Sequence, residues 1–87
     1  MSYSIKPLKP FEKFYAKRSK AEKKAIDAKF DILKENPFDK SLDVKKLQGY
    51  ERRYRLRIWD YRIFYEIYGN KLIIIMIDGE SRGDAYK

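Results

Sequence analysis

The chain contains neither cysteine nor histidine among its 87 residues. Without cysteine there is no disulfide framework and no thiol nucleophile. Without either residue type, the usual zinc sites and any mechanism that uses imidazole as a proton shuttle are excluded. We therefore expect neither a metal ion nor a cofactor.

Long hydrophobic runs are also missing. The longest, LIIIMI at 72–77, is far too short to cross a bilayer, and residues 1–10 lack the apolar core of a signal peptide. We expect a cytoplasmic protein that forms one domain over residues 1–87. Its hydrophobic fraction of 44% and aromatic fraction of 16% favour a folded chain.

Acidic residues are outnumbered, because 21 lysines and arginines face 13 aspartates and glutamates and leave a net charge of +8. Nucleic acid is the first partner that such a charge attracts and an acidic protein the second; the alternative is a charge that only keeps the chain soluble. Residues 1–36 hold nine of the 14 lysines but only one arginine, Arg18. The planar guanidinium group of arginine suits bidentate contact with phosphate. We therefore expect the anion-binding site in the arginine-rich second half of the chain.

The hydrophobic pattern predicts an α+β fold. The elements expected, in order, are a strand over 2–7, helices over about 10–18 and 19–36, an irregular loop over 37–50 and an antiparallel three-strand meander from 51 onward. Ser19 and Glu22 form a capping-box pattern that begins the second helix, and Pro37 ends it. We expect the two helices to form a hairpin and to pack on one face of a single sheet.

A two-residue turn at Trp59-Asp60 determines the pairing of the first hairpin of the meander. It places Arg57 opposite Arg62 on the sheet face that the helices do not cover. Beside these arginines the same face carries an apolar strip, made of Phe64, Ile73 and Ile75. Such a strip rimmed by charge indicates a protein partner, unless the C-terminal segment or the 37–50 loop folds over it.

Like charges directly opposite one another destabilise a sheet. The pattern predicts that only Glu66, paired with Arg53, compensates the arginines locally, so a phosphate held between Arg57 and Arg62 is the simplest resolution. Rings on which a base could stack are expected on the same face, from Phe64, Trp59 and Tyr68. The alternative is that the arginines only keep a strand face soluble.

The segments that carry most of these features are DVKKLQGY, YRLRIWDYRIFYEI and SRGDAYK. Together they resemble the RelE/ParE toxin superfamily of type II toxin–antitoxin modules, and most closely its RelE branch, over essentially the whole chain. The resemblance implies a RelE-like fold and a ribosome-dependent endoribonuclease that cuts mRNA in the A site and inhibits translation. It also implies neutralisation by a RelB-like antitoxin in a heterodimer or heterotetramer.

Carried over by motif, Arg55 and Arg57 occupy two basic positions of the first meander strand. The residues expected to be catalytic are Arg57, Arg62, Arg82 and Tyr86, and those expected to bind RNA are Arg55, Arg53, Phe64, Lys45 and Lys46. For the two lysines, a solvated loop is the alternative. The substrate 2′-OH would be the nucleophile, and arginines would stabilise the charge on the phosphorane.

This sequence departs from the family pattern in three ways. Active relatives carry lysine where this chain has Arg55 and Arg57, a small residue usually stands in place of Trp59, and the histidine of many family tails is absent. Because arginine is a poor general base, the proton acceptor stays open among Tyr86, Glu66 and Glu80. Two alternatives to the nuclease stay open: a ParE-like DNA gyrase inhibitor, and an impaired toxin that binds the ribosome or antitoxin without cutting.

Overall fold

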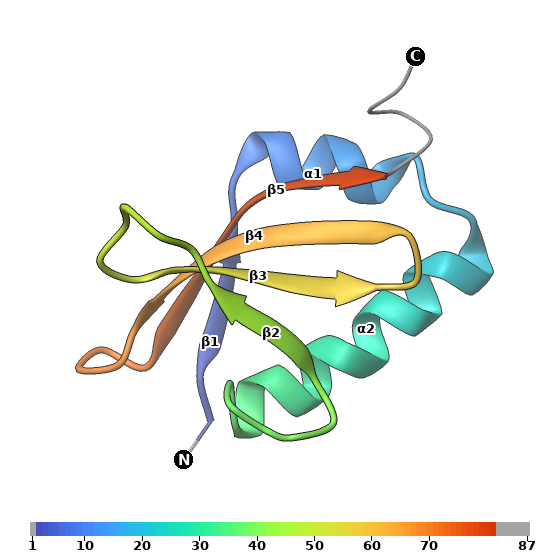
Figure 1. Ribbon diagram of the computed structural model, residues 1–87. Coiled ribbons are helices and arrows are strands. Elements are labelled where there is room, and N and C mark those ends of the chain that lie inside the picture. The colour runs from blue at the N-terminus through green and yellow to red at the C-terminus, as the bar shows by residue number, and fades with distance from the viewer. Residues whose placement is uncertain (1, 82–87) are drawn as a thin grey trace.

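The computed structural model describes residues 2–81 and forms a mixed sheet with two helices (Figure 1). Arg82 and Tyr86, two of the four residues predicted to be catalytic, lie outside the described residues. In chain order the elements are β1 (Ser4–Pro7), α1 (Lys9–Ala16), α2 (Lys20–Glu35), β2 (Asp43–Lys46), β3 (Arg53–Ile58), β4 (Tyr61–Tyr68) and β5 (Ile73–Ser81).

The five strands lie in the order β1-β5-β4-β3-β2, and both helices pack on the same side of the sheet (Figure 1). Strand β1 runs parallel to β5, and the other neighbours are antiparallel. Since β5 lies between β1 and β4, its run of isoleucines is an interior strand, as its apolar character on both faces predicts. The α+β fold and the position of the helices are thus confirmed.

Helix α2 begins and ends where the sequence predicts. The Ser19 hydroxyl accepts a hydrogen bond from the Glu22 amide at 3.2 Å, and the Ser19 amide donates to the Glu22 carboxylate at 2.6 Å. This capping box satisfies two amides that the first helical turn leaves without partners. The backbone hydrogen bond from Ser19 also lowers the pKa of Glu22. The helix ends at Glu35, and Asn36, directly before Pro37, is its C-cap.

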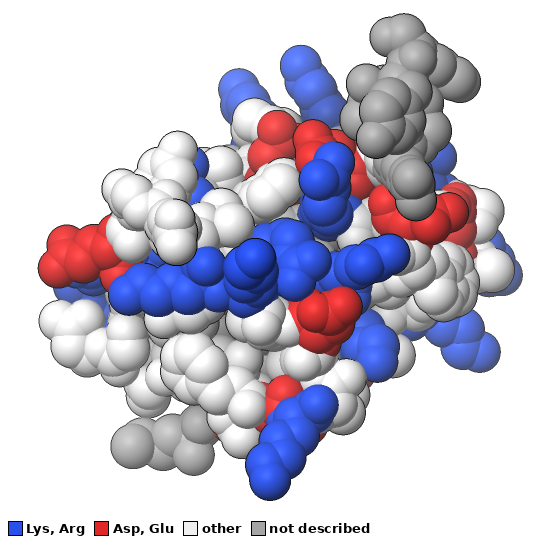
Figure 2. All heavy atoms as spheres, in the orientation of Figure 1, with Lys and Arg blue, Asp and Glu red and all other residues white. Residues whose placement is uncertain are grey.

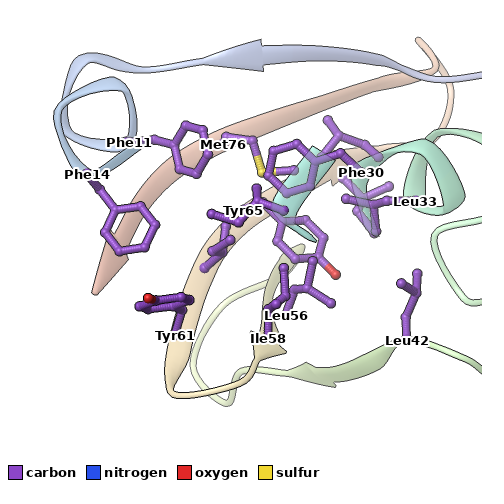
Figure 3. Packing of buried hydrophobic residues seen from close by; sticks show 14 residues of the cluster. Phe11, Phe14, Phe30, Leu33, Leu42, Leu56, Ile58, Tyr61, Tyr65 and Met76 are labelled. Atoms are coloured by element: carbon purple, nitrogen blue, oxygen red, sulfur yellow. The ribbon is translucent and has the colours of Figure 1, made fainter. Parts of the chain in front are cut away.

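The core lies between the helices and the sheet (Figure 3). Strand β4 supplies every second residue to it, as period-two alternation requires: Tyr61, Ile63, Tyr65 and Ile67 are buried. The helices contribute Phe11, Phe14, Ile26, Phe30 and Leu33. Between residues 2 and 81, no helix has the length and apolar character that crossing a membrane requires.

The expectation of an irregular loop over 37–50 is wrong for its middle part. Residues Asp43–Lys46 form β2, which pairs antiparallel with β3 at the edge of the sheet. Three of its four residues are charged, so the segment carries almost no hydrophobic alternation from which a strand could be predicted. Val44 alone packs against the core, opposite Leu56. Charged side chains of this kind protect an exposed sheet edge from pairing with other chains.

Strand β5 runs to Ser81, and its pairing with β4 contains a register shift. Tyr65 pairs with Met76 whereas Phe64 pairs with Asp78, so Ile77 is the extra residue of a β-bulge. Such an insertion turns every later side chain of the strand to the other face. Asp78 and Glu80 consequently lie on the same face as the arginines.

The hydroxyl of Tyr65 is buried and has no hydrogen-bond partner within residues 2–81. Because an unsatisfied buried hydroxyl carries a desolvation cost, we expect Tyr65→Phe to raise the free energy of unfolding by about 1 kcal/mol. The measurement is urea denaturation followed by circular dichroism. A Tyr65→Phe variant that unfolds at lower urea than the wild type would show that the hydroxyl is satisfied in solution.

The same hydroxyl predicts a loss of stability in alkali. Burial raises the pKa of Tyr65 well above its ordinary value. The unfolded chain ionises this tyrosine at about pH 10, whereas the folded protein keeps it neutral. Keeping the tyrosine neutral therefore leaves the free energy of unfolding unaffected below that pH and lowers it as the pH rises further. Tyr65→Phe should therefore flatten the fall in melting temperature above that pH, and an unchanged slope would contradict this.

Candidate nucleic-acid interface

The sheet face opposite the helices, here the open face, carries four arginines that we call the arginine band: Arg53, Arg55, Arg57 and Arg62. Their register is the predicted one, with Arg57 opposite Arg62 and Arg55 opposite Phe64. Figure 2 shows a continuous band of lysine and arginine atoms across this side of the molecule, with acidic atoms at its margins. The alternation of β3 and β4 thus gathers the cations on one surface, as expected.

Three of the four arginines are held by carboxylates. Arg53 Nη2 lies 3.1 Å from Glu66, Arg55 Nη2 lies 3.2 Å from Asp43, and Arg62 Nη2 lies 2.6 Å from Glu80. The prediction that Glu66 alone compensates the arginines is therefore wrong, and Glu80 already relieves the repulsion expected between Arg57 and Arg62. Neither Asp43 nor Glu80 could be placed from the sequence pattern, since one lies on the unexpected strand β2 and the other beyond the bulge of β5.

Arg57 differs from the rest of the band. Its side chain is exposed, and its Nε donates to the carbonyl oxygen of Trp59 at 3.4 Å. Among the residues that the structure describes, no carboxylate forms an ion pair with it. Arg57 thus presents a guanidinium charge to solvent beside the Arg62–Glu80 pair, which makes it the arginine of the band best placed to receive an anion.

A hollow of about 480 Å³ adjoins the band. Its lining residues are Lys45, Lys46, Leu47, Gln48, Arg55 and Arg62. Lys45 lies directly opposite Arg55 across the β2–β3 pairing. The Nε of Arg55 is buried and finds no hydrogen-bond partner within the described part of the chain. The cationic lining of the hollow suits an oxygen ligand such as a phosphate.

Glu66 belongs to a tightly bonded group at the far end of the band. It accepts hydrogen bonds from Arg53 Nη2 at 3.1 Å and from the Tyr68 hydroxyl at 2.9 Å, and Arg53 stacks 4.3 Å from the centre of the Tyr50 ring. The hydrogen bond to Glu66 raises the pKa of Tyr68. Both carboxylate oxygens of Glu66 are engaged, so it fits a structural role better than that of a proton acceptor.

The two remaining aromatic residues of the prediction have different surroundings. Phe64 is half-buried between Arg55 and Asp78 in the sheet register. The ring of Trp59 does not lie over the arginine band as expected; it contacts Tyr61, on the core side of β4, at a centroid distance of 6.3 Å.

Between residues 2 and 81, no cluster of three aspartates and glutamates could hold a metal ion.

The Arg62–Glu80 pair makes a testable prediction about anion binding. An incoming phosphate must approach Glu80 and compete with it for Arg62, so Glu80→Gln should tighten binding of a single-stranded oligoribonucleotide by about threefold to fivefold at low salt. Fluorescence anisotropy of a labelled decamer measures this. Glu51→Gln is the matched control, because Glu51 pairs with Arg52, outside the band. Equal affinities in both variants would show that Glu80 does not compete with RNA.

Comparison with known proteins places this geometry in a family. Residues 5–82 match the family model described as the ParE toxin of the type II toxin–antitoxin system parDE. Two proteins of Methanocaldococcus jannaschii are similar in sequence: Toxin RelE3, 46% identical over 35 residues, and Putative toxin RelE1, 38% identical over 58 residues. These matches cover 40% and 66% of this chain, and they span only 40% and 64% of the two relatives.

A solved structure extends the likeness to the whole fold. It is the archaeal RelE–RelB complex from Pyrococcus horikoshii OT3, which aligns with a TM-score of 0.83 and 30% identity. The alignment covers 95% of this chain and 98% of that one. Sequence and fold agree with the resemblance carried by the arginine strands and the turn between them: this chain belongs to the RelE/ParE superfamily of type II toxin–antitoxin toxins.

Proposed function

We propose that this protein is a ribosome-dependent endoribonuclease that cleaves mRNA in the A site and thereby stops translation in the cytoplasm. The observation that carries the proposal is the guanidinium of Arg57, which holds no carboxylate among the described residues and lies opposite Arg62 on the cationic face of the sheet. Ion pairing of the other three arginines leaves this one charge for the reacting phosphate.

The proposed reaction uses the RNA itself as nucleophile. The 2′-oxygen attacks the adjacent phosphorus, the bond from phosphorus to the 5′-oxygen breaks, and the products carry a 2′,3′-cyclic phosphate and a 5′-hydroxyl. Arg57 stabilises the negative charge that develops on the phosphorane, and Arg62 joins it once the phosphate displaces Glu80. Arg55, Lys45 and Lys46 bind flanking phosphates along the hollow.

Two proton transfers complete the step, one from the 2′-hydroxyl and one to the leaving 5′-oxygen. By its family resemblance the tail contributes Arg82 as a further cation and Tyr86 as a group that can exchange protons or stack on a base. Glu80 is the other proton acceptor that fits, since Glu66 is engaged by Arg53 and Tyr68. The pH–rate profiles of Tyr86→Phe and Glu80→Gln distinguish them, because only loss of the acceptor removes the alkaline rise in rate.

A RelB-like antitoxin is the proposed regulator. The net charge of +8 suits an acidic partner, and the half-buried Phe64, Ile73 and Ile75 offer apolar surface on the open face. The Pyrococcus horikoshii relative was solved as a complex of RelE with RelB. An antitoxin on this face would cover the arginine band and so exclude RNA from it.

Toeprinting on ribosomes that carry a defined mRNA tests the proposal. We expect cuts in the A-site codon with ribosomes present, and little cutting of the same mRNA alone. Absence of ribosome-dependent cuts would overturn the nuclease assignment. Binding to programmed ribosomes without cleavage would instead identify an impaired toxin.

Inhibition of DNA gyrase is the second candidate, because the matching family model is described as a ParE toxin. Supercoiling of a relaxed plasmid by gyrase, measured with the same preparation, separates the two. Inhibited supercoiling together with unaffected translation would favour the ParE-like function over the nuclease.

A further inference from the structure

Trp59 stands at the tip of the β3–β4 hairpin and is the only tryptophan of the chain. Its side chain is 61% exposed, and its backbone φ of 53° lies in the left-handed region that glycine adopts without steric cost. A bulky residue with a positive φ destabilises a turn, and an exposed indole adds little to the core. Backbone strain of this kind is concentrated at sites of function.

Two arginines contact the hairpin tip that carries the indole, one on each of two neighbouring residues. On one side, the Arg57 guanidinium donates to the carbonyl oxygen of Trp59 itself at 3.4 Å. On the other, the Trp59 ring lies 6.3 Å from the ring of Tyr61, and the guanidinium carbon of Arg18 lies 5.1 Å from the centre of that same Tyr61 ring. The most exposed large apolar side chain of the described residues thus stands on a turn whose backbone Arg57 contacts, beside a ring that Arg18 contacts.

We propose that Trp59 is a stacking platform for an unpaired base of the RNA strand whose phosphate Arg57 binds. This inference rests on the proposed function and adds a contact to the same site. Exposed aromatic rings beside cations are the arrangement with which proteins hold single-stranded nucleic acid, and stacking tolerates any base because every base has a π face. The hydrogen bond from Arg57 ties the indole-bearing turn to the phosphate-binding guanidinium, so a neighbouring base can reach the ring.

The position of Trp59 also explains its backbone. The left-handed turn holds the indole at the hairpin tip, where its ring contacts Tyr61 and is otherwise largely exposed. Glycine would satisfy the turn but would carry no ring. Stacking on Trp59 would raise the affinity for RNA without selecting a base sequence, whereas the arginines of the band position the phosphate.

The sole tryptophan makes a direct test possible, because intrinsic fluorescence reports on Trp59 alone. The probe is a single-stranded oligouridylate decamer with 2′-deoxy sugars, which cannot be cleaved through its 2′-oxygen. We expect quenching that saturates in parallel with binding followed by anisotropy. An abasic decamer with the same phosphates should bind with little quenching. Binding of the uridylate without quenching, or equal quenching by the abasic strand, would overturn the proposal.

Variants give a second readout. Trp59→Leu and Trp59→Gly should weaken binding of the decamer about tenfold, whereas Trp59→Tyr should stay within about threefold, because a ring is kept. Trp59→Gly should melt no lower than the wild type, which separates loss of stacking from misfolding. Phe38→Leu is the control, since Phe38 is 59% exposed but its ring packs against Tyr54. Wild-type affinity in Trp59→Leu, or an equal loss in Phe38→Leu, would refute the platform.

Failure of the inference and failure of the proposed function give different results. If the wild type cuts ribosome-bound mRNA and Trp59→Leu binds and cuts equally well, the platform is wrong and the nuclease stands. If the decamer quenches Trp59 but ribosome-bound mRNA is not cut, the platform stands without the nuclease. If Trp59→Leu loses affinity for an antitoxin and not for RNA, the residue is a protein contact and the proposal is wrong.

Discussion

Replacing Arg57 by glutamine is expected to lower the rate of mRNA cleavage on the ribosome by about 100-fold to 1,000-fold, in the range found when one preorganised donor to a developing charge is removed. The side chain is exposed and holds no carboxylate among residues 2–81, so its loss leaves no buried charge unpaired. Folding should therefore be unaffected. Single-turnover cleavage on programmed ribosomes and the melting temperature together measure the two effects.

Two further variants sharpen this prediction. Arg52→Gln removes the same charge from a residue that pairs with Glu51 at 3.4 Å, outside the arginine band, and should change the rate less than about fivefold. Arg57→Lys keeps the positive charge at this position, so it should restore most of the rate. If Arg57→Gln cleaves mRNA as fast as Arg52→Gln, Arg57 has no special role in the reaction.

Gly79→Ala is expected to lower the free energy of unfolding by about 2–3 kcal/mol, near the upper end of the usual cost of overpacking. A Cβ at position 79 would clash with the Phe14 ring, far inside van der Waals contact. Phe14 is buried and packs edge-on against Tyr61, so its ring has little room to move. Helix α1 would have to shift away from β5. Urea denaturation of both proteins measures the loss.

Gly69→Ala is the matched control for this substitution. Its Cβ would come no closer than 3.9 Å to the Tyr3 hydroxyl, which is ordinary contact, so we expect a change within about 0.5 kcal/mol. Phe14→Leu should recover part of the loss in the Gly79→Ala background, because it removes the ring that the new Cβ meets. Equal stability of the Gly79→Ala and Gly69→Ala variants would show that α1 does not approach β5 this closely in solution.

Local rules determined a large part of this protein from the sequence alone. A two-residue turn leaves no freedom of register, so Arg57 lies opposite Arg62 and Arg55 opposite Phe64, as predicted. The capping box of Ser19 and the proline after Asn36 set both ends of α2. Alternation and helical periodicity identified the covered face of the sheet. These features depend on residues a few positions apart, which is why they can be predicted from the sequence.

Tertiary structure decided the features that depend on distant segments. Strand β2 exists only because β3 offers it an edge, and Asp43 reaches Arg55 through that pairing. The single extra residue at Ile77 reverses the faces of residues 78–81, so Glu80 meets Arg62 while Gly79 faces Phe14. Strict alternation would have placed Glu80 under the helices. The sequence by itself thus determined that arginines share one face, whereas only the packed sheet decided which of them pair with carboxylates, because such pairing is set by neighbouring strands; among the described residues Arg57 has no such partner.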